Sequence, residues 1–348
     1  MNREKIIEFL LELGCFAKFR NQSISDWQHV MANSDFHGLT ESDHNIEYEL
    51  AYYAPSKCID CNLVFYTKNN EPCAILALYL LETNGVWSFS LAGKPIEPIQ
   101  FLNHVTSKER KRISKAVIHV LFEFSKNHDL GEFTCHGYNM SKNASISEWY
   151  LACAQYAQTI KLNHQIYIDL SQDLDEIKNN FRKSYKPLIG KALGLWNSAI
   201  LGPKEITNEH WREFRELHYT VSGCRNTRSE KSWVSQLSHI RSGQAFLITL
   251  RDEAHKLIGG GFFYHTRDHA SYATAAYDRT LFDKPLGHLT QWIAIKELKR
   301  LGVKLYTIGL LPFKHSMPTP SEKDFNIALF KSGFSNTVRI QYVFGFKA

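Results

Sequence analysis

One series of segments occurs twice in the chain, and this repeat constrains the fold more than any other feature of the sequence. In the first half, "NLVFYT" and "PCAILALYLL" flank the turn "KNNE", and "VWSFSLAG" follows the hairpin signal Asn84-Gly85. The loop "GKPIEPI", a helix over 106–126 and the strand "EFTCHG" complete the series. A capping box from Thr106 to Glu109 is predicted to open this helix. We therefore expect three strands, a loop, a helix and a fourth strand.

The second half repeats this order. The segments "AFLITL", "LIGGGFFYH" and "SYATAAY" are predicted strands, and the loop "DRTLFDKP", a helix over 286–301 and the strand "KLYTIG" follow them. Two more helices are predicted in front, over 207–221 and 229–241, the second ending at the C-cap signal Gly243. A boundary before the strand "QIYIDL" gives a domain over 1–164 and a domain over 165–348, which fits about 150 residues per domain.

Composition and charge exclude several classes of protein. The chain has 348 residues, of which 44% are hydrophobic and 22% charged, so long disordered tracts are excluded. No apolar run is long enough to cross a bilayer, and Glu8 and Glu12 interrupt the apolar N-terminal segment, so we expect an unprocessed cytoplasmic protein. Seven cysteines without a regular spacing favour reduced thiols. The net charge of +6 suits an anionic small substrate or tRNA and requires neither.

Three antiparallel strands followed by a helix and a parallel strand form the centre of the Gcn5-related N-acetyltransferase (GNAT) fold. The segments "IDLSQDLDEIKNNFRKSYKPLIGKA", "SYATAAYDRTLFDKPLGHLTQWIAIKELKRLGVKLYTIG" and "DFNIALFKSGF" resemble the acyltransferase domain of FemABX-type and related tandem-GNAT proteins. The resemblance covers about residues 165–348, and the first half resembles a weaker copy. It implies an α/β (α+β) fold of two GNAT-like domains, each with a mixed, largely antiparallel sheet flanked by helices.

The resemblance also implies a donor site. In GNAT proteins an acyl-pantetheine arm lies between two splayed strands, and its diphosphate lies at a helix N-terminus, where free N–H groups and the helix dipole attract an anion. The family loop reads Gln or Arg, two residues, Gly, one residue, then Gly or Ala. The stretch from Lys284 to Leu289 keeps a cation and Gly287 but ends in leucine. We expect Lys284, Gly287 and His288 to bind an acyl-CoA, with acetyl-CoA as the first choice; an aminoacyl-tRNA donor or a plain helix start after Pro285 are the alternatives.

A basic segment over 179–194 surrounds Pro187, which we expect to kink or break a helix. Its cations are Arg182, Lys183, Lys186 and Lys191. The resembling segment lies at the acceptor groove of the family, so Arg182, Lys183, Tyr185 and Lys186 are predicted to bind a phosphate or carboxylate of a saccharide. A solvated basic helix face is the alternative.

The catalytic candidates lie in two other segments. The resemblance places at Lys331, in "LFKSGF", a lysine that stabilises the oxyanion formed during acyl transfer. The alternative is a lysine that complements the helix dipole before Gly333. Tyr277 and Asp278 end the strand beside the expected donor gap and are candidates to relay a proton, although Asp278 also suits a turn.

Two further arginines are predicted to bind substrate. Arg279 follows Asp278 at the end of the same strand. Arg228 lies in "GCRNTRSEKSW" near a helix N-terminus, where the dipole disfavours a cation, so its position favours a functional role over a surface one. No metal site is expected, because Cys58 and Cys61 form a single C-x-x-C pair without a second pair or suitably spaced histidines.

These patterns predict a GNAT-type N-acyltransferase with sequential, direct transfer. The expected acceptor is the amine of a small anionic amino sugar or nucleotide sugar, in surface-polysaccharide or cell-envelope glycan biosynthesis. One alternative is an aminoacyl-tRNA-dependent FemABX-type transferase acting on a peptidoglycan precursor, and another is a non-catalytic binding module. The first half is expected to lack a donor site of its own, because Pro95 and Pro98 remove amide donors from "GKPIEPI".

Overall fold

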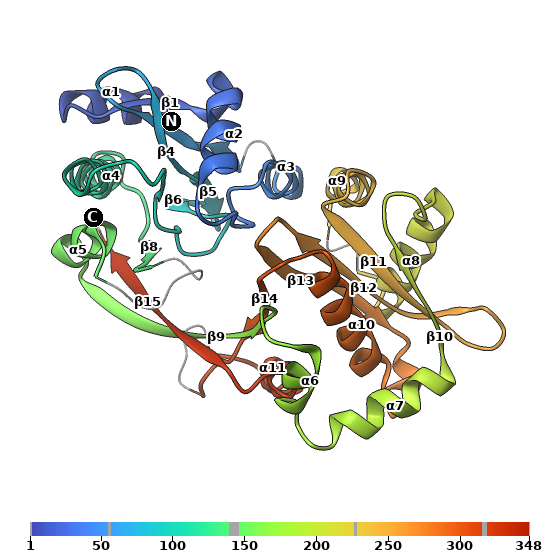
Figure 1. Ribbon diagram of the computed structural model, residues 1–348. Helices are drawn as coiled ribbons and strands as arrows, with labels where there is room; N and C mark the ends of the chain where they lie inside the picture. Colours follow the sequence, from blue (N-terminus) through green and yellow to red (C-terminus); the bar gives the residue numbers. More distant parts are fainter. Residues whose placement is uncertain (1, 55–56, 139–145, 226–227, 315–318, 348) are drawn as a thin grey trace. The chain divides into compact units, whose positions relative to one another are not determined.

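The computed structural model describes residues 2–54, 57–138, 146–225, 228–314 and 319–347. The chain forms two compact units, Met1–Asn163 with Ile340–Ala348, and His164–Arg339. The sequence-based boundary assigns the last nine residues to the second domain, whereas the structure places them in the first unit. The reason is strand β15 (Val338–Phe346), which pairs antiparallel with β8 (Phe133–His136) through residues 343–346 (Figure 1).

The first unit holds two small sheets and several helices, with strand orders β1-β3-β4-β7 and β2-β5-β6. Besides β8 and β15, its elements are α1 (Glu4–Glu12), β1 (Phe16–Phe19), α2 (Ile24–Asn33), α3 (Asp43–Tyr52), β2 (Cys58–Asp60), β3 (Leu63–Tyr66), β4 (Pro72–Leu76), β5 (Tyr79–Thr83), β6 (Val86–Ser90), β7 (Gln100–Phe101), α4 (Ser107–Asn127) and α5 (Glu148–Tyr156). The hairpin prediction is confirmed, because Asn84 and Gly85 join β5 to β6 with φ of 54° and 82°.

The segment "PCAILALYLL" is not the single strand that its pattern predicts. It divides into β4 and β5, which belong to different sheets. The buried side chain of Asn62 causes this division, because its Oδ1 accepts the N–H of Leu78 at 2.8 Å, between the two strands. A side-chain acceptor has replaced the strand ladder at this point.

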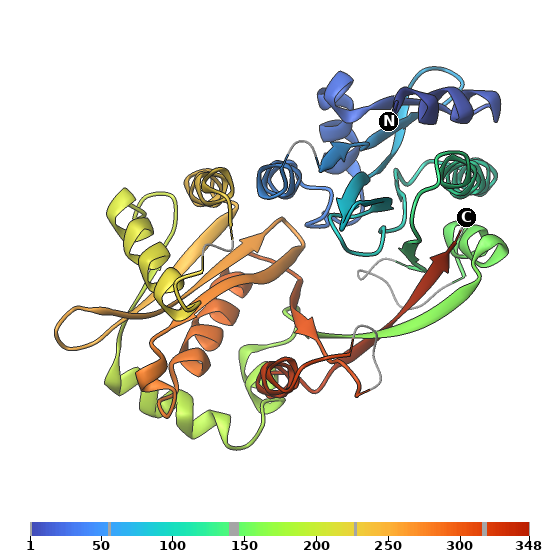
Figure 2. The same ribbon diagram turned by 180° about the vertical axis from the view of Figure 1, so that it is seen from behind.

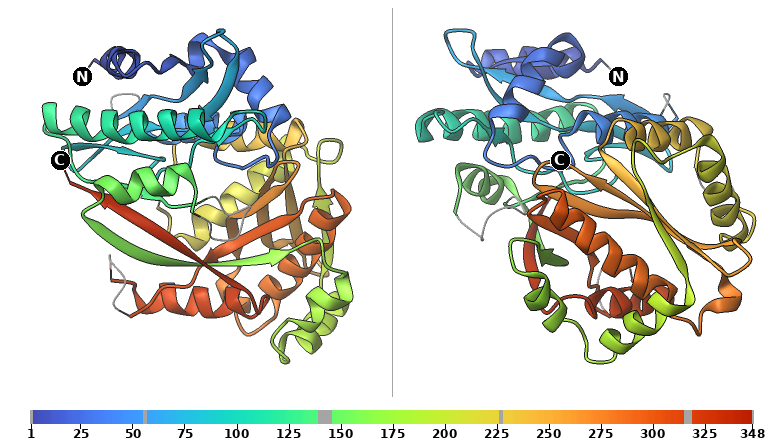
Figure 3. Two further views of the ribbon diagram at one scale, coloured as in Figure 1. Left: turned by 60° about the vertical axis from the view of Figure 1, so that its left-hand side comes forward. Right: turned by 45° about the vertical axis from the view of Figure 1, so that its right-hand side comes forward.

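Helix α4 is the long helix of the first unit (Figure 3). Thr106 is its N-cap, and the side chain of Thr106 accepts the N–H of Glu109 at 3.3 Å, so one of the two hydrogen bonds of the expected capping box is present. Its buried face includes Ile113, Val117 and Leu121, spaced four residues apart. This face packs in the hydrophobic core of the first unit.

The second unit is built around strands in the order β10-β11-β12-β13-β14-β9. Its elements are β9 (Thr159–Asp169), which begins in the first unit, α6 (Leu174–Asn179), α7 (Tyr185–Leu195), β10 (Asn197–Leu201), α8 (Asn208–Val221), α9 (Glu230–Arg241), β11 (Ala245–Arg251), β12 (Leu257–His265), β13 (His269–Tyr277), α10 (Leu286–Arg300), β14 (Leu305–Leu310) and α11 (Glu322–Ser332). Strands β11, β12 and β13 are antiparallel, and β14 is parallel to β13. The expected GNAT centre is therefore present.

Helices cover both faces of this sheet, with α10 on one face and α8 and α9 on the other (Figures 1 and 2). The glycines of β12 allow both layers to approach closely. A Cβ atom on Gly260 would lie 3.0 Å from the ring of Phe214 in α8, and one on Gly261 would lie 2.8 Å from Thr290 in α10. The sequence "GGG" thus brings α10 against the strands that carry the site described below.

Pro187 does not kink a helix. Helix α6 ends at Asn179 and α7 begins at Tyr185, so Pro187 is the third residue of α7. In the first turn of a helix the amide has no intrahelical partner, and a proline there removes no hydrogen bond. The break in the basic segment lies before α7, over 180–184, and not at the proline. Among the described residues, no helix combines the length and hydropathy that a membrane span requires.

Candidate functional site

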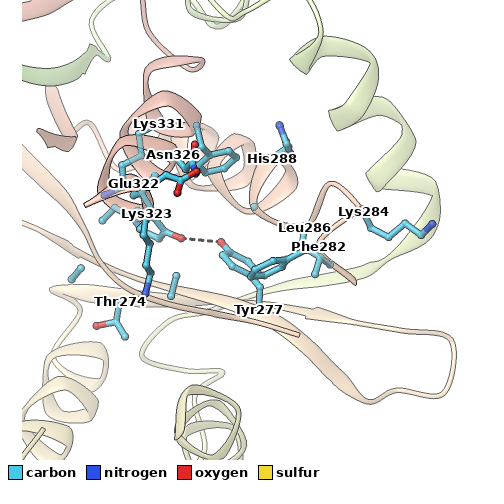
Figure 4. A pocket seen from close by; sticks show the side chains of 16 residues that line it. Thr274, Tyr277, Phe282, Lys284, Leu286, His288, Glu322, Lys323, Asn326 and Lys331 are labelled. Carbon is cyan, nitrogen blue, oxygen red and sulfur yellow. Dashed lines mark hydrogen bonds between the residues drawn. The ribbon is translucent and has the colours of Figure 1, made fainter. Parts of the chain in front are cut away.

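A cavity of about 910 Å³ lies in the second unit, and we call it the donor cavity (Figure 4). Three elements line it: the second half of β13, the first turn of α10 with the loop before it, and one face of α11. Its size is at the upper end of the range for ligand sites, roughly 300–1,000 Å³. The walls are mainly apolar, and charged side chains come from Lys284, Glu322, Lys323 and Lys331.

The cavity opens where β13 and β14 separate. These strands pair in parallel only from His269 with Leu305 to Ser271 with Thr307. From Tyr272 onward, β13 lines the cavity instead. The pairing of β13 with β12 skips Ala273, which marks a β-bulge at the same point. The β13–β14 ladder therefore ends where the cavity begins, but among the described residues α11, and not β14, forms the wall opposite β13.

The N-terminus of α10 faces the donor cavity. Pro285 occupies the N-cap position, provides no side-chain cap, and no acidic residue lies in the first turn. The amide of Leu286 donates to Lys284 O at 3.0 Å, whereas the amides of Gly287 and His288 have no acceptor among the residues that the structure describes. Free amides at a helix N-terminus attract an anion. Lys284, at the mouth, is ion-paired with Asp283 at 2.6 Å.

Gly287 and His288 also pack against aromatic rings. A Cβ atom on Gly287 would lie 2.9 Å from Cζ of Phe330, so a larger residue here would displace that ring. The ring centroid of His288 lies 4.4 Å from that of Tyr185 and 5.1 Å from that of Phe330, both edge-on. Burial, with the nearby charge of Arg182, lowers the pKa of His288 to about 4. His288 is therefore a neutral ring near pH 7.

Lys331 projects from α11 to the donor cavity and has no carboxylate within 4.0 Å among the described residues (Figure 4). Its Nζ lies 5.5 Å from the ring centroid of Tyr272, and it packs so closely on Gly309 that a Cβ atom there would lie 2.9 Å from Nζ. Burial lowers the pKa of Lys331 from its usual range. The side chain thus lies inside the site, although Lys331 is also in the last turn of α11, where a cation complements the dipole.

Two tyrosine hydroxyls form a pair beside the cavity. The hydroxyl oxygens of Tyr272 and Tyr277 are 2.9 Å apart, as the dashed line in Figure 4 marks. Burial raises the pKa of both phenols, so each stays protonated near pH 7. A protonated phenol can donate a proton but is a poor base. Tyr277 was a sequence candidate, whereas Tyr272 was missed because its segment reads as an ordinary strand.

Asp278 and Arg279 lie outside the donor cavity. The carboxylate of Asp278 accepts from the amide of Thr280 at 3.0 Å and from its hydroxyl at 2.7 Å, and it caps the 3₁₀ helix Arg279–Leu281. These bonds lower the pKa of Asp278, which makes it a weak base. The geometry of Asp278 is that of the turn-forming alternative. Arg279 is exposed.

The basic segment contacts the end of α11 and does not line the cavity. Arg182 Nη2 donates to Leu329 O at 3.1 Å, and the hydroxyl of Tyr185 donates to Phe330 O at 3.0 Å. Lys186 Nζ donates to Asn179 Oδ1 at 3.0 Å, and Lys183 is exposed. Arg182 and Tyr185 thus satisfy carbonyl groups that the helix end leaves free.

Arg228 lies between α8 and α9 and does not line the donor cavity. Its guanidinium lies 5.3 Å from the ring centroid of Trp233, which Arg215 also approaches at 5.6 Å. His218 meets the same indole edge-on at 5.1 Å. These contacts form a separate aromatic and basic group.

Sequence reasoning missed most of the α11 wall, which contributes Glu322, Lys323, Asn326 and Ile327. A signal was present, because Glu322, Asn326 and Phe330 recur every four residues and so share one helix face. The spacing alone does not predict whether this helix face lines a cavity, packs in the core or is exposed to solvent.

Comparison with known proteins shows similarity in structure only. No protein-family model matches the sequence, and no curated protein matches it. The solved structure of FemX matches with a TM-score of 0.63 and 10% identity, over 91% of this chain and 95% of that one. The chain has a GNAT/FemABX-like fold.

Two further solved structures have a similar fold. The C-terminal domain of a putative lysylphosphatidylglycerol synthetase from Agrobacterium fabrum matches with a TM-score of 0.60 and 10% identity, over 100% of this chain and 93% of that one. A tandem GNAT protein from the clavulanic acid biosynthesis pathway matches with a TM-score of 0.51 and 14% identity, over 94% of this chain and 97% of that one. The expected fold class, two GNAT-like domains with helix-flanked sheets, is confirmed. At these identities the likeness shows the fold alone.

Proposed function

We propose that this chain is an N-acyltransferase that binds an acyl-CoA in the donor cavity and transfers the acyl group to the amine of an anionic amino sugar. The pathway we propose is surface-polysaccharide or cell-envelope glycan biosynthesis. One observation carries the proposal: along the part of β13 beyond its ladder with β14, a single cavity connects the uncapped N-terminus of α10 to the amine of Lys331, which has no ion partner in the described part of the chain.

The donor would lie along β13. Its phosphates would accept from the amides of Gly287 and His288 and pair with Lys284 at the mouth. Its pantetheine arm would follow β13 beyond Ser271, where the ladder to β14 ends and leaves backbone groups available to the amides of the arm. The apolar walls exclude water from the thioester.

In the proposed reaction the amine attacks the carbonyl carbon of the acyl group directly. The new N–C bond forms, the C–S bond breaks, and the thiolate leaves with a proton. Lys331 would stabilise the oxyanion, and the proton that the attacking amine loses would pass to the thiolate through the paired hydroxyls of Tyr272 and Tyr277, which both end protonated. Holding the two reactants in one cavity supplies part of the rate gain.

The charge of the cavity supports an anionic ligand. Lys323 and Lys331 lie on the α11 wall with Glu322, the one carboxylate among the residues that line the cavity, and Lys284 adds a third cation. The basic segment around Arg182 no longer supports the acceptor site, since its donors bind carbonyl groups of α11.

An aminoacyl-tRNA donor is the second candidate, and one observation favours it. Leu289 is fully buried in the core at the position where the GNAT loop has glycine or alanine, so the phosphate loop differs from the usual pattern. The tRNA end would present an ester to the same cavity.

Calorimetric titration tests the choice of donor. We expect acetyl-CoA to bind to the purified full chain and to raise its unfolding free energy by about 2.7 kcal/mol at a hundred times the dissociation constant. Binding of charged tRNA without binding of acetyl-CoA would replace the first candidate by the second. Binding of acetyl-CoA without transfer to any amino sugar would support a binding module instead.

A further inference from the structure

The amine of Lys331 differs from that of Lys299, another partly buried lysine of the second unit. Lys299 Nζ donates to Leu170 O at 3.1 Å and to Gln172 O at 2.7 Å, so its hydrogen bonds are used within the fold. No hydrogen bond or ion pair engages Lys331 Nζ among the described residues, and its neighbours are the ring of Tyr272 and the backbone of Gly309. An amine in this position is available to whatever occupies the cavity.

We propose that Lys331 is acylated by the donor bound in the donor cavity when no acceptor is present. The proposal rests on the proposed function, because it requires an activated acyl group beside Lys331. It assigns a covalent modification to a residue whose other role is to stabilise the transition state.

The chemistry balances without another reactant. The neutral form of the amine attacks the carbonyl carbon of the thioester, an N–C bond forms and the C–S bond breaks. The amine proton passes to the leaving thiolate, directly or through the paired hydroxyls of Tyr272 and Tyr277, which lie beside it. The products are an N-acyl-lysine amide and the free thiol of CoA. Burial lowers the pKa of Lys331, which enlarges the neutral, nucleophilic fraction.

Acylation of Lys331 would inactivate the site. The amide of acyl-lysine is uncharged and cannot act as a cation toward the oxyanion. It is also a far weaker acyl donor than a thioester, so the group is not passed on to an acceptor. A chain that holds donor but no acceptor would therefore lose activity with time, whereas an acceptor in the cavity would intercept the acyl group and protect Lys331.

The test is to incubate the full chain with acetyl-CoA and no acceptor, then to measure intact mass and map the acetylated peptides. We expect one acetyl group per chain, on Lys331, and turnover that falls in proportion to the acetylated fraction. The variant Lys331→Arg should stay unmodified. Lys183→Arg is the matched control, because Lys183 is exposed and does not line the cavity, and this variant should still acetylate Lys331.

Calorimetry on the same preparations separates the two proposals. Binding of acetyl-CoA with Lys331 unmodified would overturn the self-acylation proposal and leave the proposed function standing. Equal acetylation of surface lysines in the wild type and in Lys331→Arg would also overturn it. Absence of acetyl-CoA binding would overturn both. The peptide map of the wild-type chain decides the matter even if Lys331→Arg fails to fold.

Discussion

The helices α4 and α10 occupy the same place in the repeated series of elements, but their N-termini differ. At α4, Thr106 accepts the amide of Glu109, and the Glu109 carboxylate is ion-paired with Arg112. At α10, Pro285 provides no cap, and the amides of Gly287 and His288 stay free among the described residues. A side chain thus accepts one of the first amides of α4, whereas among the described residues no side chain caps α10.

The cavities beside α4 and α10 also differ, in their volume. One cavity of the first unit, beside α4, measures about 140 Å³, and the donor cavity of the second unit measures about 910 Å³. Arg110, which lines the smaller one, donates to the carbonyls of Leu102 and Val105, so its charge serves the fold. The comparison teaches that the same order of elements does not produce the same site. That the first unit binds no donor stays a prediction.

The largest effect is expected at Lys331. If its ammonium stabilises the oxyanion, Lys331→Met lowers turnover about a hundredfold or more with little change in the affinity of either substrate, because the interaction exists only in the transition state. Turnover and the unfolding midpoint should be measured on one preparation. Intact turnover with a stability loss well under about 1 kcal/mol would leave Lys331 only its role at the helix end.

Grafting the α4 terminus onto α10 should weaken donor binding. The double variant Pro285→Thr and His288→Glu creates the pattern Thr-x-x-Glu at the start of α10, and its own side chains would then occupy the free amides. We expect the dissociation constant of acetyl-CoA to rise about tenfold, which corresponds to about 1.4 kcal/mol. Unchanged affinity, measured by calorimetry, would show that the α10 N-terminus does not bind the donor.

The reciprocal change in the first unit should affect stability alone. Thr106→Ala removes the N-cap of α4, and we expect a loss of about 1 kcal/mol in the free energy of unfolding, from a typical range of about 0.5–2 kcal/mol. Denaturant unfolding measures this loss. The dissociation constant of acetyl-CoA should stay unchanged, and a clear increase would indicate a donor site at α4.

Arg182 should act on folding more than on substrate. Its side chain donates to Leu329 O, so Arg182→Ala is expected to cost about 1 kcal/mol of stability, typical of one hydrogen bond, with nearly unchanged Michaelis constants. Lys183→Ala is the matched control, because Lys183 is its exposed neighbour. A higher Michaelis constant for the anionic acceptor at unchanged stability would restore the acceptor role that the sequence predicted.

The smallest expected effect is a change in the pH dependence of stability. The pKa of His288 is about 4 in the folded chain and near 6.5 when unfolded, so the unfolded chain binds the extra proton between these values. Stability contributed by neutral His288 is therefore present above about pH 6.5 and is lost as the pH falls toward 4. His288→Gln should flatten the curve in this window, and an unaltered slope in urea unfolding would contradict the assignment.

Part of the site could be predicted from the sequence, because it depends on local rules. The turn at Asn84-Gly85 and the start of α10 after Pro285 follow from backbone conformations that few residues adopt. Gly287, Lys284 and Lys331 were found through motif resemblance, and all three line the donor cavity. Arg182 was also chosen by resemblance, whereas Asp278 and Arg279 were chosen by their place at the end of a strand. All three lie outside the cavity, because neither criterion determines which way a side chain points.

Local patterns in the sequence predict the repeated series of strands and helices, the turn at Asn84-Gly85 and the antiparallel centre of the second unit, since hydrophobic period and local backbone preferences act within a few residues. Three features do not follow from any local pattern: most of the last strand belongs to the first unit, Tyr272 meets Tyr277, and Lys331 lies in a cavity with no ion partner among the described residues. These features depend on contacts between residues far apart in the chain. The direction of a side chain and its pKa follow from what packs around it, which no local pattern contains.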